Sequence, residues 1–258
     1  MEMPLLATQV QGSETGRAPL LIAHGLFGSA RNWATFARTL SAGRRVVAVD
    51  MRNHGSSFRA ATQSYADMAS DLARVAASLP AVPDVLGHSM GGKAAMMLAL
   101  TRPELVRRLV VADIAPVAYA HSQAPLVRAM QELDLGAVTR RSEADAQLAG
   151  RVPDPATRAF LLQSLDLSQR PPVWRLNLPV LLAEMDAIVG WPDPGGRFEG
   201  ETLFLAGVLS GYVLPAHRDR ILALFPRARF AALPGAGHWL HADRPREFEA
   251  AVAAFLDR

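Results

Sequence analysis

The chain has 258 residues, 50% of them hydrophobic, and its 27 basic and 24 acidic residues give a formal net charge of +3. This length fits one large α/β domain with an inserted subdomain, and the apolar content supports a sizeable core. The absence of cysteine excludes disulfides, thiolate catalysis and cysteine-ligated zinc, and it favours a cytoplasmic enzyme.

Charge and hydropathy exclude two further classes of protein. The isoelectric point of about 9.9 reflects arginine, because Lys93 is the only lysine and the arginines are spread along the chain. No basic run therefore indicates a nucleic-acid surface, and we expect no nucleic-acid partner. The apolar stretches are far shorter than a membrane span, and the first residues lack the basic region and apolar core of a signal peptide.

The first part of the chain alternates short apolar runs with helical patterns. Continuous apolar runs are typical of strands buried on both faces, whereas apolar residues spaced three and four apart predict helices. The predicted strands cover residues 20–23, 46–49, 82–86 and 109–112, and the predicted helices cover 33–40, 68–79 and 92–100. Ser64 and Asp67 form a capping box before the second helix. This alternation predicts an α/β fold, with a mostly parallel sheet flanked by helices.

Strand patterns disappear between residues 115 and 200. Helical runs punctuated by Pro and Gly replace them, over 126–133, 142–148, 156–165 and 178–189. The strand pattern returns over residues 202–206 and 229–233. A last helix follows, with Asp243 as the expected N-cap and Pro245 in its first turn. We expect a sheet domain of residues 1–114 and 201–258, interrupted by a helical cap over residues 115–200.

The segment Gly87-His88-Ser89-Met90-Gly91 matches G-x-S-x-G, the pattern of a nucleophile elbow, between a predicted strand and a predicted helix. In such a turn the serine hydroxyl stands clear of the backbone, and the glycines remove Cβ atoms that would collide. The N-terminus of the following helix points unpaired N–H groups at the place where an oxyanion forms. Ser89 is therefore the predicted nucleophile.

A serine hydroxyl needs a base, which is usually a histidine held by a carboxylate. Among the seven histidines His238 is the best candidate, because it lies on a glycine-rich loop after the last predicted strand. We expect His88 to pack beside the serine, His241 to lie in a loop or at the surface, and His54 to be a turn residue.

The first predicted strand ends in the loop His24-Gly25-Leu26-Phe27-Gly28. A loop at this place can turn a backbone N–H toward the nucleophile. The predicted oxyanion hole consists of the N–H of Leu26 and the N–H of Met90, the residue after Ser89. The N–H of Phe27 replaces that of Leu26 if the loop is shifted by one residue.

Five segments together carry a family resemblance: HGLFGSARNW (24–33), DMRNHGSS (50–57), GHSMGGKAAM (87–96), ADIAPV (112–117) and GAGHWLHADRP (235–245). With these motifs the chain resembles the α/β-hydrolase superfamily over nearly its full length, and within it the YbfF-type bacterial esterases and their mitochondrial relatives. The resemblance implies an α/β-hydrolase fold with a helical cap. It also implies a serine–histidine–acid hydrolase that acts on acyl esters, with acyl-CoA thioesters as a further substrate class.

The identity of the acid requires a separate argument. In most of the superfamily the acid follows the strand after the cap, but Ser210 occupies that position here, and a hydroxyl cannot neutralise an imidazolium. Asp113 ends the strand next to the elbow strand, where ligand-side groups gather in open α/β sheets. The resembled esterases also take their acid from this Asp-Ile-x-Pro segment. Asp113 is the predicted acid, and Asp186, Asp193 and Asp219 remain alternatives.

Large apolar residues are frequent in the helical insertion, and a subset of them is expected to line an acyl pocket over the nucleophile. The predicted pocket residues are Phe27, Trp174, Met185, Trp191 and Tyr212.

We predict hydrolysis of esters of medium-sized hydrophobic acyl groups, without metal or cofactor. A carbon–carbon bond hydrolase or a cofactor-free perhydrolase could use the same triad, and an acyltransferase would need a site that excludes water. A non-catalytic binding protein on this fold would be expected to lack the elbow, the oxyanion loop or the base. The sequence carries no signal for the oligomeric state.

Overall fold

The computed structural model describes residues 4–258 and has a seven-stranded sheet at its centre, in the order β1-β3-β2-β4-β5-β8-β9. The strands are β1 (Thr8–Gln11), β2 (Leu20–Ala23), β3 (Val46–Val49), β4 (Asp84–His88), β5 (Arg108–Ala112), β8 (Glu201–Gly207) and β9 (Ala228–Leu233). All neighbouring strands are parallel except β1 and β3, which are antiparallel. The predicted α/β class with a mostly parallel sheet is confirmed.

The central strands are short and apolar because helices cover both of their faces. Every residue of β2, β3 and β4 is buried, as expected for parallel strands without a solvent-exposed face. The register between β4 and β5 places His88 opposite Ala112. The next residues along the chain, Ser89 and Asp113, therefore leave the sheet side by side at its carboxyl edge.

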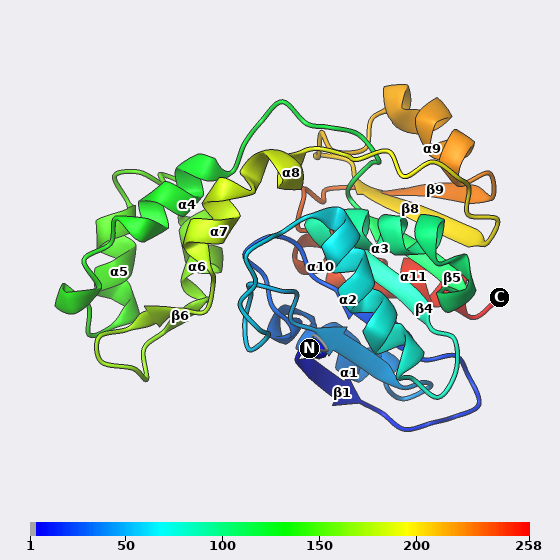
Figure 1. The fold of residues 1–258 in the computed structure, drawn as a ribbon, viewed down its shortest axis with the longest axis horizontal. Coiled ribbons are helices and arrows are strands. Elements are labelled where there is room, and N and C mark those ends of the chain that lie inside the picture. Colours follow the sequence, from blue (N-terminus) through cyan, green and yellow to red (C-terminus); the bar gives the residue numbers. More distant parts are fainter. Residues whose placement is uncertain (1–3) are drawn as a thin grey trace.

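Two helical layers flank this sheet (Figure 1). One apolar cluster joins α2, α3 and α9 to one face, and a second cluster joins η1, α1 and α11 to the other. The bounds of the helices outside the inserted segment are η1 (Ala30–Trp33), α1 (Ala34–Leu40), α2 (Tyr65–Ala77), α3 (Met90–Thr101), η2 (Pro103–Leu105), η4 (Pro215–His217), α9 (Arg218–Leu224), α10 (Leu240–Asp243) and α11 (Pro245–Leu256). The predicted cap of α2 is present, since Ser64 Oγ accepts the N–H of Asp67 at 3.2 Å.

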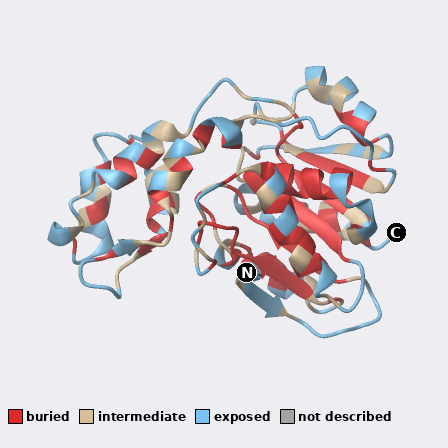
Figure 2. Cartoon of the chain, viewed as in Figure 1, coloured by how far each residue is buried: buried red, intermediate tan, exposed pale blue. Residues whose placement is uncertain are grey.

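Between β5 and β8 the chain leaves the sheet, and we call residues 115–200 the helical segment. It contains α4 (Ala124–Gln131), η3 (Leu135–Ala137), α5 (Arg141–Leu148), α6 (Pro155–Leu162), α7 (Leu178–Ala183) and α8 (Met185–Val189), with a small hairpin of β6 (Leu165–Asp166) and β7 (Val173–Trp174). Figure 1 shows these helices to one side of the sheet. Figure 2 shows that they bury narrow stripes, whereas the central strands and α3 are buried almost throughout.

Some details differ from the sequence-based expectation. The sequence does not predict the edge strand β1, since Thr8–Gln11 is mostly exposed and offers a single apolar residue. The helix predicted over residues 178–189 is two helices that meet at Glu184. Asp243 does not cap the last helix: it ends α10, and its carboxylate accepts the N–H of Gly237 at 2.8 Å.

Candidate active site

The elbow between β4 and α3 is a strained turn centred on Ser89. Its φ of 53° lies in the left-handed region, which non-glycine residues adopt only when the surrounding structure holds them there. A Cβ added to Gly87 would lie 2.3 Å from the carbonyl oxygen of Gly91, and a Cβ on Gly91 would lie 2.3 Å from that of Ala23. Both glycines are therefore required by close backbone approach, as the sequence predicts.

Three side chains from distant parts of the chain form one hydrogen-bonded series at the carboxyl edge of the sheet. His238 Nδ1 lies 2.8 Å from Asp113 Oδ2, and His238 Nε2 lies 3.0 Å from Ser89 Oγ. Because a carboxylate only accepts hydrogen bonds, Nδ1 carries the proton and Nε2 accepts the hydrogen bond of the serine hydroxyl. The Asp113 side chain is fully buried, whereas that of His238 is 25% exposed and opens to the site.

The carboxylate of Asp113 has two further donors on the loop after β8. The N–H of Gly207 donates to Oδ1 at 3.0 Å, and the hydroxyl of Ser210 donates to Oδ2 at 2.5 Å. Sequence reasoning treats Ser210 only as a missing acid. In the structure its hydroxyl contacts the carboxylate of Asp113, which directly follows the neighbouring strand β5.

The alternative acids lie away from this series. Asp193 pairs with Arg220 at 2.6 Å, and Asp186 and Asp219 are exposed on α8 and α9. Among residues 4–258, none of the three is hydrogen-bonded to His238.

Two further histidines pack behind the base. His88 Nε2 donates to the carbonyl oxygen of His238 at 2.8 Å, and burial holds the pKa of His88 well below its ordinary value. His241, expected in a loop or at the surface, lies half-buried on α10: its ring stacks on Trp33 with 4.4 Å between centroids, and burial lowers its pKa to about 4. These contacts fix the loop that carries His238 against η1 and the elbow.

The loop after β2 carries Leu26, one of the two residues whose N–H groups are predicted to form the oxyanion hole. The N–H of Phe27 donates to His54 Nε2 at 3.2 Å, and the N–H of Gly28 donates to the carbonyl oxygen of Gly25 at 3.0 Å. Within residues 4–258 the N–H groups of Leu26 and Met90 donate to no protein acceptor. The predicted pair is therefore free for a ligand, while the Phe27 alternative is already engaged.

The sequence does not predict that His24 and His54 are buried rings that accept backbone hydrogen bonds. His24 Nε2 accepts the N–H of Met51 at 2.9 Å, and burial lowers the pKa of His24 to about 4. His54 is fully buried, its Nδ1 lies 2.8 Å from the carbonyl oxygen of Arg52, and burial lowers its pKa to about 3. Both rings are therefore uncharged acceptors near neutral pH.

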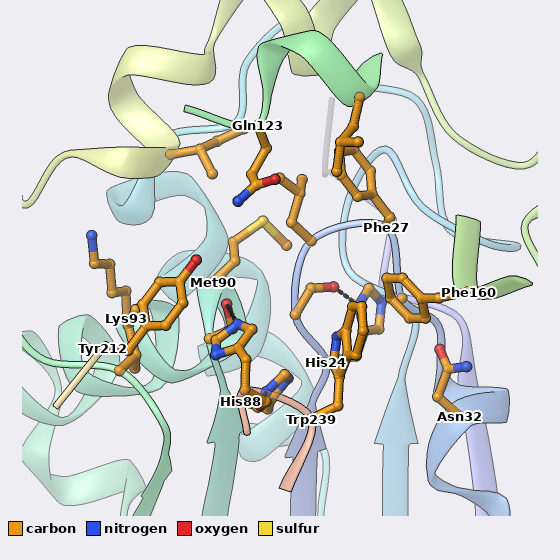
Figure 3. A pocket seen from close by; sticks show the side chains of 18 of the residues that line it. His24, Phe27, Asn32, His88, Met90, Lys93, Gln123, Phe160, Tyr212 and Trp239 are labelled. Carbon is orange, nitrogen blue, oxygen red and sulfur yellow. Dashed lines mark hydrogen bonds between the residues drawn. The ribbon is translucent and has the colours of Figure 1, made fainter. Parts of the chain in front are cut away.

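A pocket lies over Ser89, between the sheet loops and the helical segment. Figure 3 shows Phe27, Met90 and Tyr212 around it, with Phe160 and Trp239 to one side and Lys93 to the other. The Tyr212 ring stacks on the imidazole of His238, with 4.0 Å between centroids. The walls are mainly apolar, as is typical of a site for a small molecule with a hydrophobic part.

Three of the five predicted pocket residues do not line this pocket. Trp174 donates its indole N–H to the carbonyl oxygen of Met130 at 3.0 Å, and Met185 is 3% exposed within the core. The ring of Trp191 lies 6.3 Å from that of Tyr65. These side chains pack the helices of the segment against their neighbours. Phe160 and Trp239, which the sequence does not single out, lie at the pocket instead.

Lys93 is the unexpected charged residue of the pocket. It is 1% exposed, and its Nζ donates to the carbonyl oxygens of Val189 at 2.9 Å and Gly190 at 2.6 Å. Nζ also lies 4.7 Å from the centre of the Tyr119 ring, a cation–π distance. Burial lowers the pKa of Lys93 to about 7. The only lysine of the chain thus ties α3 to the end of α8.

Among residues 4–258 no helix has the length and hydropathy to cross a bilayer. In the same residues no group of three or more His, Asp or Glu side chains is arranged so that it could hold a metal ion.

Comparisons with known proteins agree with this architecture. The family model described as "alpha/beta hydrolase fold" matches residues 18–245. Among curated proteins, the chain is 41% identical to the "sn-1-specific diacylglycerol lipase ABHD11" of Mus musculus, covering 98% of this chain and 85% of that protein. It is 35% identical to "Esterase YbfF" of Escherichia coli strain K12, covering 98% of both chains.

Solved structures give the same result. The structure named "Marine microorganism esterase" superposes with a TM-score of 0.92 at 32% sequence identity, covering 98% of this chain and 100% of that one. The sheet order, the elbow and these relatives together show that the chain belongs to the α/β-hydrolase superfamily.

Proposed function

We propose that this chain hydrolyses carboxylic esters through an acyl intermediate on Ser89. The observation that carries the proposal is the hydrogen-bonded series from Ser89 through His238 to Asp113, with distances of 3.0 Å and 2.8 Å. Relatives named as an esterase and a lipase, which cover nearly the whole chain, support ester hydrolysis as the reaction class.

The acylation step begins when His238 Nε2 takes the proton of the Ser89 hydroxyl as its oxygen attacks the ester carbonyl carbon. The carbonyl oxygen becomes an oxyanion, which the unpartnered N–H groups of Leu26 and Met90 stabilise. The imidazolium then gives its proton to the leaving alkoxide, so that the alcohol departs and the acyl group stays on Ser89.

The deacylation step repeats this chemistry with water. His238 Nε2 takes a proton from water as the water oxygen attacks the acyl carbonyl carbon. The bond between Ser89 Oγ and the acyl carbon then breaks, the imidazolium returns its proton to Ser89 Oγ, and the carboxylic acid leaves. Asp113 keeps the imidazole in the reactive tautomer and stabilises its charged form, while Gly207 and Ser210 fix the orientation of the carboxylate.

The substrate is proposed from the shape and polarity of the pocket. The apolar walls suit a medium-sized hydrophobic acyl group, with Phe27 and Tyr212 beside the reacting carbonyl. We include acyl-CoA thioesters, because attack on a thioester carbonyl uses the same groups. Residues 115–200 would then act as a cap over the core of residues 1–114 and 201–258. The cysteine-free composition fits a cytoplasmic enzyme.

A chain-length series of p-nitrophenyl esters beside the matching acyl-CoAs tests the proposal. Wild type is expected to turn over the esters, and Ser89→Ala is expected to lose about 10⁴-fold or more in kcat. A fluorophosphonate probe should label Ser89 in the wild type and fail to label the variant. Esterase activity that survives Ser89→Ala would contradict the serine mechanism, and labelling without ester turnover would point to the carbon–carbon hydrolase alternative.

A further inference from the structure

The oxyanion loop is held from two sides at a single strained residue. Phe27 has a φ of 65°, in the left-handed region that a bulky aromatic residue rarely adopts. Such a conformation persists only where neighbouring groups determine it. Leu26, whose N–H is a proposed oxyanion donor, directly precedes Phe27, so the contacts that hold Phe27 in place also restrict the position of the loop that carries this N–H.

The sheet domain holds the N–H side of Phe27. This N–H donates to His54 Nε2 at 3.2 Å, and His54 Nδ1 donates in turn to the carbonyl oxygen of Arg52 at 2.8 Å. The ring is fully buried and uncharged near neutral pH, so Nε2 remains an acceptor under working conditions.

The helical segment holds the other side. The hydroxyl of Ser164, which is 8% exposed in the turn between α6 and β6, donates to the carbonyl oxygen of Phe27 at 2.9 Å. The same turn is fixed within the segment, because the N–H of Arg175 donates to the carbonyl oxygen of Ser164 at 2.8 Å. Ser164 is therefore a rigid donor that belongs to the segment and acts on the loop of the sheet domain.

The segment also docks on the loop that carries His54. The N–H of Asn177 donates to the carbonyl oxygen of Asn53 at 2.9 Å, and Leu176 forms a β-bridge with His54. Both hydrogen bonds of the Phe27 backbone therefore depend on the position of the helical segment. The bond to Ser164 depends on it directly, and the bond to His54 depends on it through Asn53 and Leu176.

We propose that Ser164 is a positioning residue that couples the seating of the helical segment to the formation of the oxyanion hole. The segment then contributes to the rate as well as to the shape of the pocket, because the loop reaches its active conformation only when the segment is in place. The proposal rests on the proposed ester hydrolysis and adds a residue 137 positions away from Phe27 in sequence to its machinery.

Ser164→Ala removes the hydroxyl that donates to Phe27. It is expected to lower kcat by about ten- to a hundredfold and to leave KM within twofold. This loss of kcat is smaller than that from removing an oxyanion donor, because the N–H of Leu26 is displaced but still present. An alkyl trifluoromethyl ketone, whose adduct with Ser89 presents an oxyanion, should bind more weakly by a similar factor. Ser164→Thr, which keeps the hydroxyl, should restore both values. A purely structural role would not produce this parallel loss at an unchanged KM.

The matched control is the neighbouring Gln163, which joins the same turn to the sheet domain through Asn32 at 2.6 Å without touching the oxyanion loop. Gln163→Ala is expected to keep kcat within twofold. If Ser164→Ala does not fold, Ser164→Cys replaces it, because a thiol of similar size is a weak donor and should give the same loss.

Two results would overturn the proposal. A Ser164→Ala enzyme with wild-type kcat, or with a raised KM alone, would show that Ser164 only shapes the pocket. Wild-type protein that hydrolyses no ester and leaves Ser89 unlabelled by a fluorophosphonate would overturn the proposed function and this inference together. If wild type is active and Ser164→Ala keeps its kcat, only the role of Ser164 is overturned, and the proposed ester hydrolysis stands.

Discussion

The two faces of the pocket are built in different ways. On the sheet side, Ser89 and Asp113 directly follow the carboxyl ends of β4 and β5, where parallel pairing fixes their separation, and His238 lies on the loop after β9. On the opposite side, α6 and α8 present apolar side chains from short helices that bury only narrow stripes. The sheet side therefore allows little variation in the chemistry, while the helical side can change the pocket without disturbing the register of the strands.

Several polar contacts join the sheet domain to the helical segment, and some of them involve residues that line the pocket. Ser164 reaches the oxyanion loop, and Lys93 reaches the end of α8 from the helix that begins after the nucleophile. A variant on the sheet side should therefore change kcat for every substrate. A variant on the helical side should change the preference among substrates, and a variant at a junction should affect both regions.

The largest expected effect comes from the sheet side. Asp113→Asn should lower kcat by about 10⁴-fold for every ester, because asparagine can hold the imidazole in the wrong tautomer. The measurement is kcat over the ester series, with Asp219→Asn on α9 as the matched control, expected to stay within twofold. A mild loss of kcat in Asp113→Asn with a severe loss of kcat in Asp219→Asn would show that the acid is Asp219 on α9.

The second expected effect is a pH dependence of the free energy of unfolding that comes from Lys93, which joins α3 to the end of α8. Burial lowers its pKa from 10.5 to about 7, so between these values the unfolded chain binds more protons than the folded protein. The contribution of Lys93 to the free energy of unfolding therefore rises with pH from about 7 to about 10.5, and it is least favourable below pH 7.

Lys93→Met removes this dependence and should be measured by urea unfolding at pH 7 and pH 9. At each pH, the free energy of unfolding of wild type is subtracted from that of the variant. This difference should be about 2 kcal/mol more positive at pH 7 than at pH 9, because the buried lysine destabilises wild type more at the lower pH. Other titrating groups cancel in this difference. A difference that does not change with pH would mean that Lys93 keeps an ordinary pKa in the folded protein.

The same contrast explains what the sequence could predict. Strand residues 20–23 and 46–49 coincide with β2 and β3, because buried parallel strands have a continuous apolar pattern. The elbow pattern predicts Ser89, and the glycine-rich loop after the last strand predicts His238. Asp113 is predicted from its place at a strand end together with the family resemblance, and the structure brings the three side chains within hydrogen-bonding distance.

Pocket residues on the helical side could not be selected in this way. Helical periodicity shows which face of a helix is buried, but not what that face is buried against. Trp174 and Met185 are as apolar as Phe160, yet Phe160 faces the pocket while the other two pack among the helices. The roles of His54 and Ser164 were equally hidden, because each depends on one hydrogen bond to a backbone group distant in sequence.

The smallest expected effect tests this assignment of the pocket wall. Phe160 lies on α6, and its ring is 5.2 Å from that of Trp239. Phe160→Ala should raise KM for medium-chain esters by about five- to tenfold through lost apolar contact, with kcat for a short ester within threefold. Trp174→Phe is the matched control from the same segment, since its side chain faces Met130 rather than the pocket. The chain-length profile should therefore change in Phe160→Ala and stay as in wild type in Trp174→Phe; the reverse result would place the acyl group behind the helices, away from α6.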